Sequence, residues 1–217
     1  DIDGKTVYTG GINISDEYAN YEHPRFGYWK DTAIRLDGPA VRTFTIMFLQ
    51  LWNVANKTME EASGYRKFAD VPCEKHSGQG VTIPYGDDAF NGEDVAENVY
   101  NYILAKAHDY VHIMTPYTIL DNTMINALSF AAKRGVDVSV IVPKHYDHYI
   151  TFCVGRTFIK TLIEKGIRVY EYNPGFIHAK SFVSDGNRAT VGSINLDYRS
   201  LFHHFECGVF LYKSPEI

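Results

Sequence analysis

The sequence predicts an α/β fold of two similar lobes, in which mixed, largely parallel sheets are flanked by helices. Three observations indicate it. Helical and strand-like segments alternate through residues 93–217, which is typical of sheets covered by helices. A passage near the amino terminus recurs at an offset of 182 residues, which indicates an internal duplication. The 217 residues are 45% hydrophobic and 14% aromatic, enough to bury a substantial core.

The first lobe is expected to occupy residues 1–63. The chain predicts strands over residues 6–9 and 29–36 and a helix over residues 39–56. Residues 64–92 carry repeated glycines and prolines, so we expect a linker or long loop there, with one strand.

Residues 93–217 are expected to form the second lobe. Helices are predicted over residues 94–108, 122–134 and 151–165, and each precedes an apolar strand, over residues 111–114, 136–142 and 167–172. Segments rich in Phe, Ile and Val predict further strands over residues 177–183, 189–194 and 205–212.

The repeated passage is the most informative feature of the chain. Residues 3–13 align with residues 185–195 and share Asp, Gly, Gly, Ile and Asn at matching places. The second copy also has an upstream half, Phe176-Ile-His-Ala-Lys-Ser-Phe-Val-Ser. Its complete pattern is therefore H-x-K, four residues, D, six residues, then G-S-x-N.

This spacing predicts a site for an anionic group. Side chains alternate along a strand, so His178 and Lys180 share one face. A hairpin after Ser184 could bring Ser193 and Asn195 beside them. An imidazole, an ammonium, a hydroxyl and an amide together suit a phosphoryl group, because they offer a nucleophile or acid and partners for its oxygens.

The pattern resembles the second HKD motif of the phospholipase D superfamily, and the chain resembles its bacterial cardiolipin synthases. Passages that carry the wider resemblance include Tyr28-Trp-Lys-Asp-Thr, Ile113-Met-Thr-Pro-Tyr and Gly192-Ser-Ile-Asn-Leu-Asp-Tyr-Arg-Ser. The resemblance implies a fold of two phospholipase D-type lobes. It implies phospholipid synthesis by transfer of a phosphatidyl group between two phosphatidylglycerol molecules, giving cardiolipin and glycerol through a phosphohistidine, without a cofactor or a metal.

Three alternatives stay open, and one of them, a non-catalytic lipid-binding or structural module, is disfavoured by the intact second motif. A phospholipase D or a phosphatidylserine synthase-type transferase would share the same catalytic residues. A phosphodiesterase or nuclease of the superfamily is the second, and the net charge of −5 disfavours it because nucleic-acid binders usually present a basic face. We therefore expect a phospholipid partner at a membrane surface and no nucleic acid.

The resemblance also implies roles for single residues. In the family one motif histidine attacks phosphorus and the other acts as acid and base. The residues alone leave both roles open for His178, and the resemblance to two-motif enzymes favours the acid and base role. Lys180 is expected to neutralise a phosphoryl oxygen. Glu206 is expected to orient the motif histidine, and Asp31 to be its counterpart in the first lobe. We take Asp185 as a motif member that mainly shapes the hairpin.

Phosphate binding is expected from Ser193 and Asn195, with Asn13 lining the same pocket from the opposite side. The first motif otherwise leaves Asp3, Gly10 and Gly11, and Gly11 stands where the second copy has a serine. Its H-x-K would precede residue 1. We therefore expect a longer polypeptide in the bacterial cell membrane, with a hydrophobic amino-terminal anchor, and expect this chain alone to be soluble and inactive.

Two further segments are expected to lie near the site. His145-Tyr-Asp-His148 holds two histidines, but no other ligand has metal-site spacing, so we interpret it as a loop at the mouth of the site that touches the headgroup. Thr115-Pro-Tyr117 follows a predicted strand and is expected to line the same pocket. The chain has no apolar run of eighteen residues, the length that spanning a membrane requires.

Overall fold

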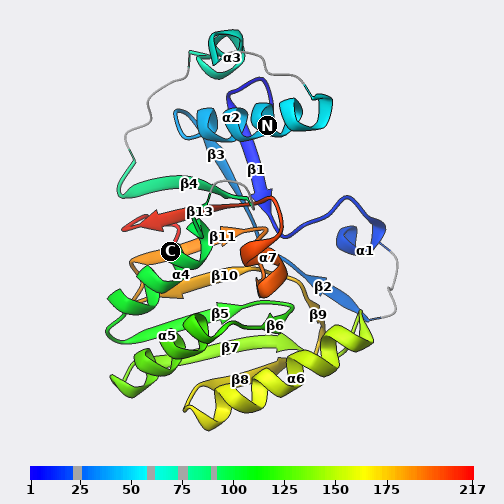
Figure 1. Cartoon of the computed structure of the whole chain (residues 1–217), viewed down its shortest axis with the longest axis vertical. Coiled ribbons are helices and arrows are strands. Elements are labelled where there is room, and N and C mark those ends of the chain that lie inside the picture. The colour runs from blue at the N-terminus through cyan, green and yellow to red at the C-terminus, as the bar shows by residue number, and fades with distance from the viewer. Residues whose placement is uncertain (22–25, 58–61, 73–77, 89–91) are drawn as a thin grey trace.

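A mixed sheet of seven strands forms the centre of the computed structural model, which describes residues 1–21, 26–57, 62–72, 78–88 and 92–217 (Figure 1). Across the sheet the strands are β4 (Val81–Asp87), β13 (Glu206–Tyr212), β11 (Arg188–Gly192), β10 (Ser181–Ser184), β5 (Tyr110–Met114), β7 (Asp137–Pro143) and β8 (Arg168–Tyr172). The predicted α/β class is confirmed.

The sheet is less parallel than the sequence predicted. Four of its neighbouring strand pairs are antiparallel, and only β5–β7 and β7–β8 are parallel. The reason is that β10 and β11 form a hairpin, closed by Asp185 and Gly186 with φ of 52° and 59°. Only the segments joined through helices pair in parallel, because a parallel pair needs a long crossover.

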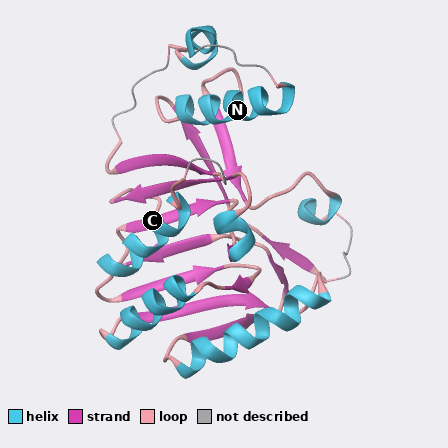
Figure 2. Ribbon diagram, in the orientation of Figure 1, coloured by secondary structure: helices cyan, strands magenta, loops and turns pink. Residues whose placement is uncertain are grey.

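Three helices cover one face of this sheet: α4 (Val95–Lys106), α5 (Asn122–Lys133) and α6 (Tyr149–Glu164) (Figure 2). They match the predicted helices to within about two residues at each end. Side chains from helices and strands form one continuous core, which includes Ile103, Leu128, Val140, Leu162 and Phe182. This packing holds the carboxyl end of β5 and the loop before α6 in fixed positions.

A smaller unit packs on the other face. β1 (Thr6–Gly10) and β3 (Ala33–Asp37) form an antiparallel pair, followed by α2 (Val41–Asn56). A second cluster of buried apolar side chains, Val7, Leu36, Phe44, Val209 and Leu211 among them, joins this pair and α2 to β11 and β13. The amino-terminal segment therefore shares a core with the carboxyl-terminal strands.

The predicted linker contains regular structure. α3 (Ala62–Ala69) lies next to α2, and β4 is the expected strand, which pairs along its whole length with β13 at the edge of the large sheet. Residues 73–77 and 89–91 of the linker lie outside the described residues.

Two strand predictions were wrong in the same way. The strand expected over residues 29–36 is two strands, β2 (Tyr28–Lys30) and β3, and the strand expected over 177–183 is also two, β9 (Gly175–Ile177) and β10. β2 pairs in parallel with β9 in a separate small sheet. The chain therefore changes sheets twice, at Asp31-Thr32 and at His178-Ala179-Lys180.

Four short elements were not predicted: α1 (Asp16–Ala19), β6 (Thr118–Ile119), β12 (Leu196–Asp197) and α7 (Tyr198–Phe202). They span two to five residues, too few for a periodic pattern. Within the described part of the chain, every helix is too short or too polar to cross a membrane.

Candidate functional site

The two copies of the repeated passage fold alike. β1 covers residues 6–10 and β11 covers residues 188–192, the same positions at the offset of 182. The turn before each has left-handed backbone, with φ of 53° at Asp3 and 52° at Asp185. After the strand, Asn13 donates to the Tyr18 hydroxyl (3.0 Å) and Asn195 donates to the Ser200 hydroxyl (3.1 Å), again five residues on.

Strand register also makes Asp31 and Glu206 equivalent. Gly10 of β1 faces Ala33 of β3, and Gly192 of β11 faces Gly208 of β13. Asp31 and Glu206 each lie two residues before those partners. The sequence offset between the two carboxylates is 175 and not 182, so the repeat alone does not align them, whereas the strand register does.

His178 is held by the amino-terminal half of the chain. Its backbone N–H donates to Lys30 O (2.8 Å), because β9 runs beside β2. Its Nδ1 lies 2.9 Å from Asp31 Oδ2 and 3.1 Å from Gly11 O. A proton on Nδ1 satisfies both acceptors, which leaves Nε2 of the buried ring to exchange a proton with a substrate.

Lys180 lies against the same ring. Its Nζ is 2.6 Å from His178 Nδ1 and 3.0 Å from Nε2, and it donates to the His178 carbonyl oxygen. Burial lowers the pKa of Lys180 to about 8, although the carboxylates of Asp31, Glu206, Asp197 and Asp147 act to raise it. The ammonium is thus a desolvated cation next to the imidazole. His178 and Lys180 were expected on one face of a strand, but they lie in the segment between β9 and β10.

Glu206 does not contact His178, contrary to the expected orienting role. It accepts hydrogen bonds from Ser193 (2.5 Å) and Ser200 (3.1 Å), and its Oε1 lies 3.6 Å from His204 Nδ1. Burial raises its pKa, while these hydrogen bonds act to lower it. The reason for the difference is the β2–β9 pairing, which brings Asp31 of the other half to His178.

The remaining polar residues of the two motifs lie on both sides of His178 and Lys180. Ser193 follows β11, and its hydroxyl joins Glu206 to the backbone N–H of Cys207 (3.1 Å). Asn195 keeps a buried Oδ1 that has no hydrogen-bond partner. Asn13 lies within hydrogen-bond distance of Tyr18, whose hydroxyl is 3.4 Å from His178 Nε2. Their predicted role in phosphate binding stays a prediction.

Asp185 lies away from His178, at the opposite end of β10. Its carboxylate accepts from the backbone N–H groups of His108, Asp109 and Tyr110, at 2.9 to 3.0 Å. Partial burial acts to raise its pKa, but these hydrogen bonds hold the pKa below the ordinary value. Asp185 therefore ties the hairpin to the start of β5. Of its two expected roles, the position supports the shaping of the hairpin and not a direct part in catalysis.

Aromatic residues that the sequence reasoning did not select surround the imidazole. Tyr18 meets the His178 ring edge-on, with centroids 5.2 Å apart, and Trp29 lies 5.9 Å away. Phe176 packs on Trp29 at 4.6 Å. Burial raises the pKa of Tyr18 to about 12, so its hydroxyl stays protonated at neutral pH. The Tyr28-Trp-Lys-Asp passage was the available signal, since it carries Trp29 beside Asp31.

Gly11 leaves the space that Asp31 uses. A Cβ atom there would lie 2.2 Å from Asp31 Oδ1 and 2.9 Å from His178 O. This explains why Gly11, the residue that corresponds to Ser193, has no side chain. In the second half the Ser193 hydroxyl donates to Glu206, whereas in the first half Asp31 occupies the space that a side chain at residue 11 would need.

Replacing Gly11 with alanine is expected to displace Asp31 from His178. Because both neighbours are held by backbone pairing, we expect an overpacking cost of about 1–3 kcal/mol in the free energy of unfolding. Thermal unfolding measures it. Gly78→Ala is the matched control, since nothing lies within 4 Å of its Cβ. Equal stability of the two variants would contradict the prediction.

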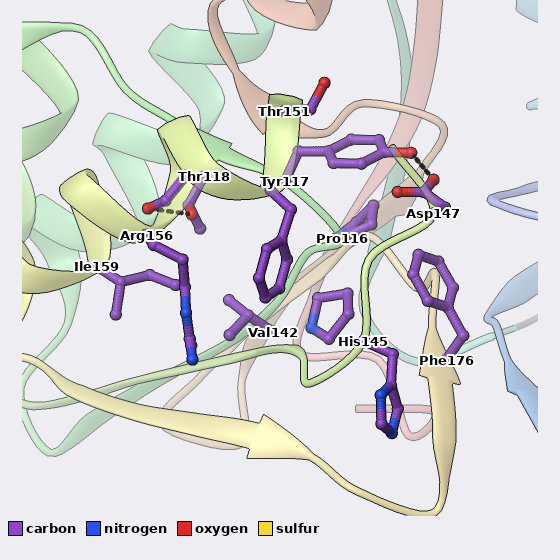
Figure 3. Close-up of a pocket in the computed structure, with 13 residues that line it drawn as sticks. Pro116, Tyr117, Thr118, Val142, His145, Asp147, Thr151, Arg156, Ile159 and Phe176 are labelled. Atoms are coloured by element: carbon purple, nitrogen blue, oxygen red, sulfur yellow. Dashed lines mark hydrogen bonds between the residues drawn. The ribbon is translucent and has the colours of Figure 1, made fainter. Parts of the chain in front are cut away.

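A small pocket lies beside the centre, between the β5–β6 turn and the loop before α6 (Figure 3). Its volume is about 20 Å³, and its lining includes Tyr117, His145, Asp147 and Phe176. The Tyr117 hydroxyl points at Asp147 and donates to its Oδ2. His148 lies in the same loop, and within the described ranges no three His, Cys, Asp or Glu side chains form a metal-binding group.

Comparison with known proteins gives one family match. The family described as "Cardiolipin synthase, PLD-like domain" matches residues 101–217. An uncharacterized protein of Streptococcus mutans serotype c is 49% identical over 98% of this chain and 45% of its own length. The major cardiolipin synthase of Bacillus subtilis (strain 168) is 36% identical over 97% of this chain and 43% of its own length.

The chain therefore spans less than half the length of these relatives. Among solved structures, phosphatidylserine synthase of Haemophilus influenzae Rd KW20 superposes with a TM-score of 0.68 at 16% identity. The overlap covers 98% of this chain and 57% of that one. At this identity the superposition supports the fold alone.

Proposed function

The chain belongs to the family described as the phospholipase D-like domain of cardiolipin synthase, and we propose that it forms half of a site that transfers a phosphatidyl group between two phosphatidylglycerol molecules. The observation that carries the proposal is the contact of His178 Nδ1 with Asp31, on an imidazole whose two nitrogens both lie within 3.0 Å of the Lys180 ammonium. An oriented imidazole and a buried cation are what a phosphodiester needs for proton transfer and charge neutralisation.

The second catalytic histidine comes, in this proposal, from another part of a longer polypeptide. The register equivalence of Asp31 and Glu206 supports it. Since Asp31 of the first half orients His178 of the second, Glu206 is placed by the same symmetry to orient a first-half histidine. Residues 1–63 then belong to the first lobe and residues 93–217 form the second.

The reaction proceeds in two proton-balanced steps. The first-half histidine attacks phosphorus, the P–N bond forms, and the P–O bond to glycerol breaks as His178 Nε2 gives its proton to the leaving oxygen. The hydroxyl of a second phosphatidylglycerol then gives its proton back to His178. Its oxygen bonds to phosphorus, the P–N bond breaks, and cardiolipin is released. Lys180 neutralises a phosphoryl oxygen throughout.

The test uses the full-length polypeptide and vesicles of phosphatidylglycerol. We expect cardiolipin and free glycerol in equal amounts, and no product from the isolated chain, which has one of the two histidines. We also expect the activity at the bacterial membrane, where the lipid is. Phosphatidic acid as the main product would favour a phospholipase D, and cleavage of single-stranded DNA would favour a nuclease.

Transfer is expected to decline as the pH rises through about 8. Burial lowers the pKa of Lys180 to that value, so its charge is lost there instead of near 10.5. The effect on stability has the opposite sign. Between about pH 8 and 10.5 the unfolded lysine binds the proton that the folded one has released, so the free energy of unfolding rises with pH.

The pH dependence of transfer and of denaturant unfolding would measure both effects. Lys180→Met is expected to remove this contribution from the unfolding profile. Lys213→Met is the control. An unfolding profile for Lys180→Met that matches the wild-type profile would rule out a depressed pKa.

A further inference from the structure

We propose that Asp147 and Tyr117 form a subsite for the hydroxyl groups of a polyol headgroup, next to His178. The proposal rests on the proposed function and deepens it, because it names residues that select the alcohol. Asp147 lies between β7 and α6, and Tyr117 lies between β5 and β6. They lie far apart in the chain, and the core positions both turns beside one pocket (Figure 3).

Asp147 has free hydrogen-bonding capacity. One oxygen accepts from the Tyr117 hydroxyl, and Oδ1 accepts from the backbone N–H of His148 (2.6 Å). A carboxylate offers about four acceptor positions, so about two remain. The side chain is 17% exposed, so a ligand can reach it. Hydroxyl groups are donors that could fill the unused acceptor positions of Asp147, and a terminal glycerol carries two hydroxyl groups on neighbouring carbons.

The charge of Asp147 argues against a role in phosphate binding. It acts on Lys180 together with Asp31, Asp197 and Glu206, so four carboxylates already raise the pKa of this buried ammonium. A phosphodiester anion would be repelled by a further carboxylate. A neutral hydroxyl that donates to Asp147 gains a charge-assisted hydrogen bond instead. The carboxylate therefore suits the alcohol part of the substrate.

The size of the pocket agrees. A volume of about 20 Å³ is enough for about one water molecule or one hydroxyl group. Burial raises the pKa of Tyr117 well above its ordinary value, and the hydrogen bond to Asp147 adds to this. The phenol therefore stays protonated and keeps donating to Asp147, which fixes the direction of the carboxylate.

The subsite adjoins the reacting imidazole through Phe176, which lines the pocket and whose ring centroid lies 6.3 Å from that of His178. The Tyr18 hydroxyl lies 3.4 Å from His178 Nε2. An alcohol whose outer hydroxyls bind Asp147 can thus present its reacting oxygen on the His178 side. A monohydric alcohol has no outer hydroxyl to bind, so its use does not depend on Asp147.

The test compares two acceptors with the full-length enzyme and phosphatidylglycerol vesicles: labelled glycerol and ethanol. Asp147→Asn is expected to lower incorporation of glycerol about tenfold or more, since it replaces an acceptor-only group with an amide and removes the charge. Transfer to ethanol is expected to stay within about threefold. Tyr117→Phe is expected to shift the ratio in the same direction by a smaller factor. Glu164→Gln, which removes an exposed carboxylate of α6, is the control.

Three outcomes would overturn the subsite. Equal loss with both alcohols would mean that Asp147 only holds its loop, and an unchanged ratio would mean that it binds no hydroxyl. A wild-type enzyme that forms no cardiolipin in the same vesicles would overturn the proposed function, and the subsite with it. The first two leave the proposed function standing.

Discussion

His178→Ala in the full-length polypeptide is expected to lower phosphatidyl transfer by about 10²- to 10⁴-fold, the usual contribution of a general acid and base. The fold should survive, because the imidazole contacts site residues and not the main apolar core. Phosphatidylglycerol vesicles and quantified cardiolipin measure the rate. Circular dichroism measures the melting temperature.

The control for this variant is His112→Ala, which removes an exposed strand histidine on β5. Its transfer rate should match the wild type. If His178→Ala also retained a rate within about threefold of wild type, His178 would not be the acid and base, and the site would have to lie elsewhere.

Asp31→Asn is expected to have the second largest effect, a loss of about 10²- to 10⁴-fold in transfer. The substitution keeps the size of the side chain but removes the charge that fixes the Nδ1 proton and stabilises the imidazolium, as in hydrolases with a carboxylate behind the histidine. The vesicle assay measures it, and the pH profile should change along with the rate.

Asp37→Asn is the matched control, since it changes an exposed carboxylate at the end of β3, the strand that follows Asp31, where Arg35 is its ion-pair partner. Transfer by Asp31→Asn at the rate of Asp37→Asn would contradict the orienting role. The melting temperatures of both variants should lie close to wild type, which separates a catalytic loss from unfolding.

The regular elements could be predicted from the sequence because their periods are local. α4, α5 and α6 and the strands after them follow from repeated apolar positions within each segment. The repeat at an offset of 182 similarly indicated that β1 and β11 are alike, since five identical residues lie within eleven positions.

The partner of His178 could not be predicted in the same way. It depends on the pairing of β2 with β9, and nothing local in either segment specifies a partner about 150 residues away. The same pairing splits the two expected long strands. Sequence reasoning correctly matched Asp31 with Glu206 as counterparts, yet assigned the orienting role at His178 to the carboxylate of the same half.

Tyr18 and Asp147 were difficult to identify for another reason. Tyr18 belongs to a helix of four residues, and Asp147 to a loop, where no period marks an inward-facing side chain. In the sequence, the two histidines that flank Asp147 were the residues considered, as possible metal ligands. Only the three-dimensional arrangement shows that the Asp147 carboxylate acts on the charge of Lys180.

The contact between His178 and Asp31 joins residues 147 positions apart. A nascent or partly folded chain has both side chains but not their contact, so its imidazole lacks a fixed tautomer. Under the proposed function, acid and base catalysis by His178 therefore depends on completed folding, because the first-half carboxylate reaches the second-half imidazole only in the folded chain.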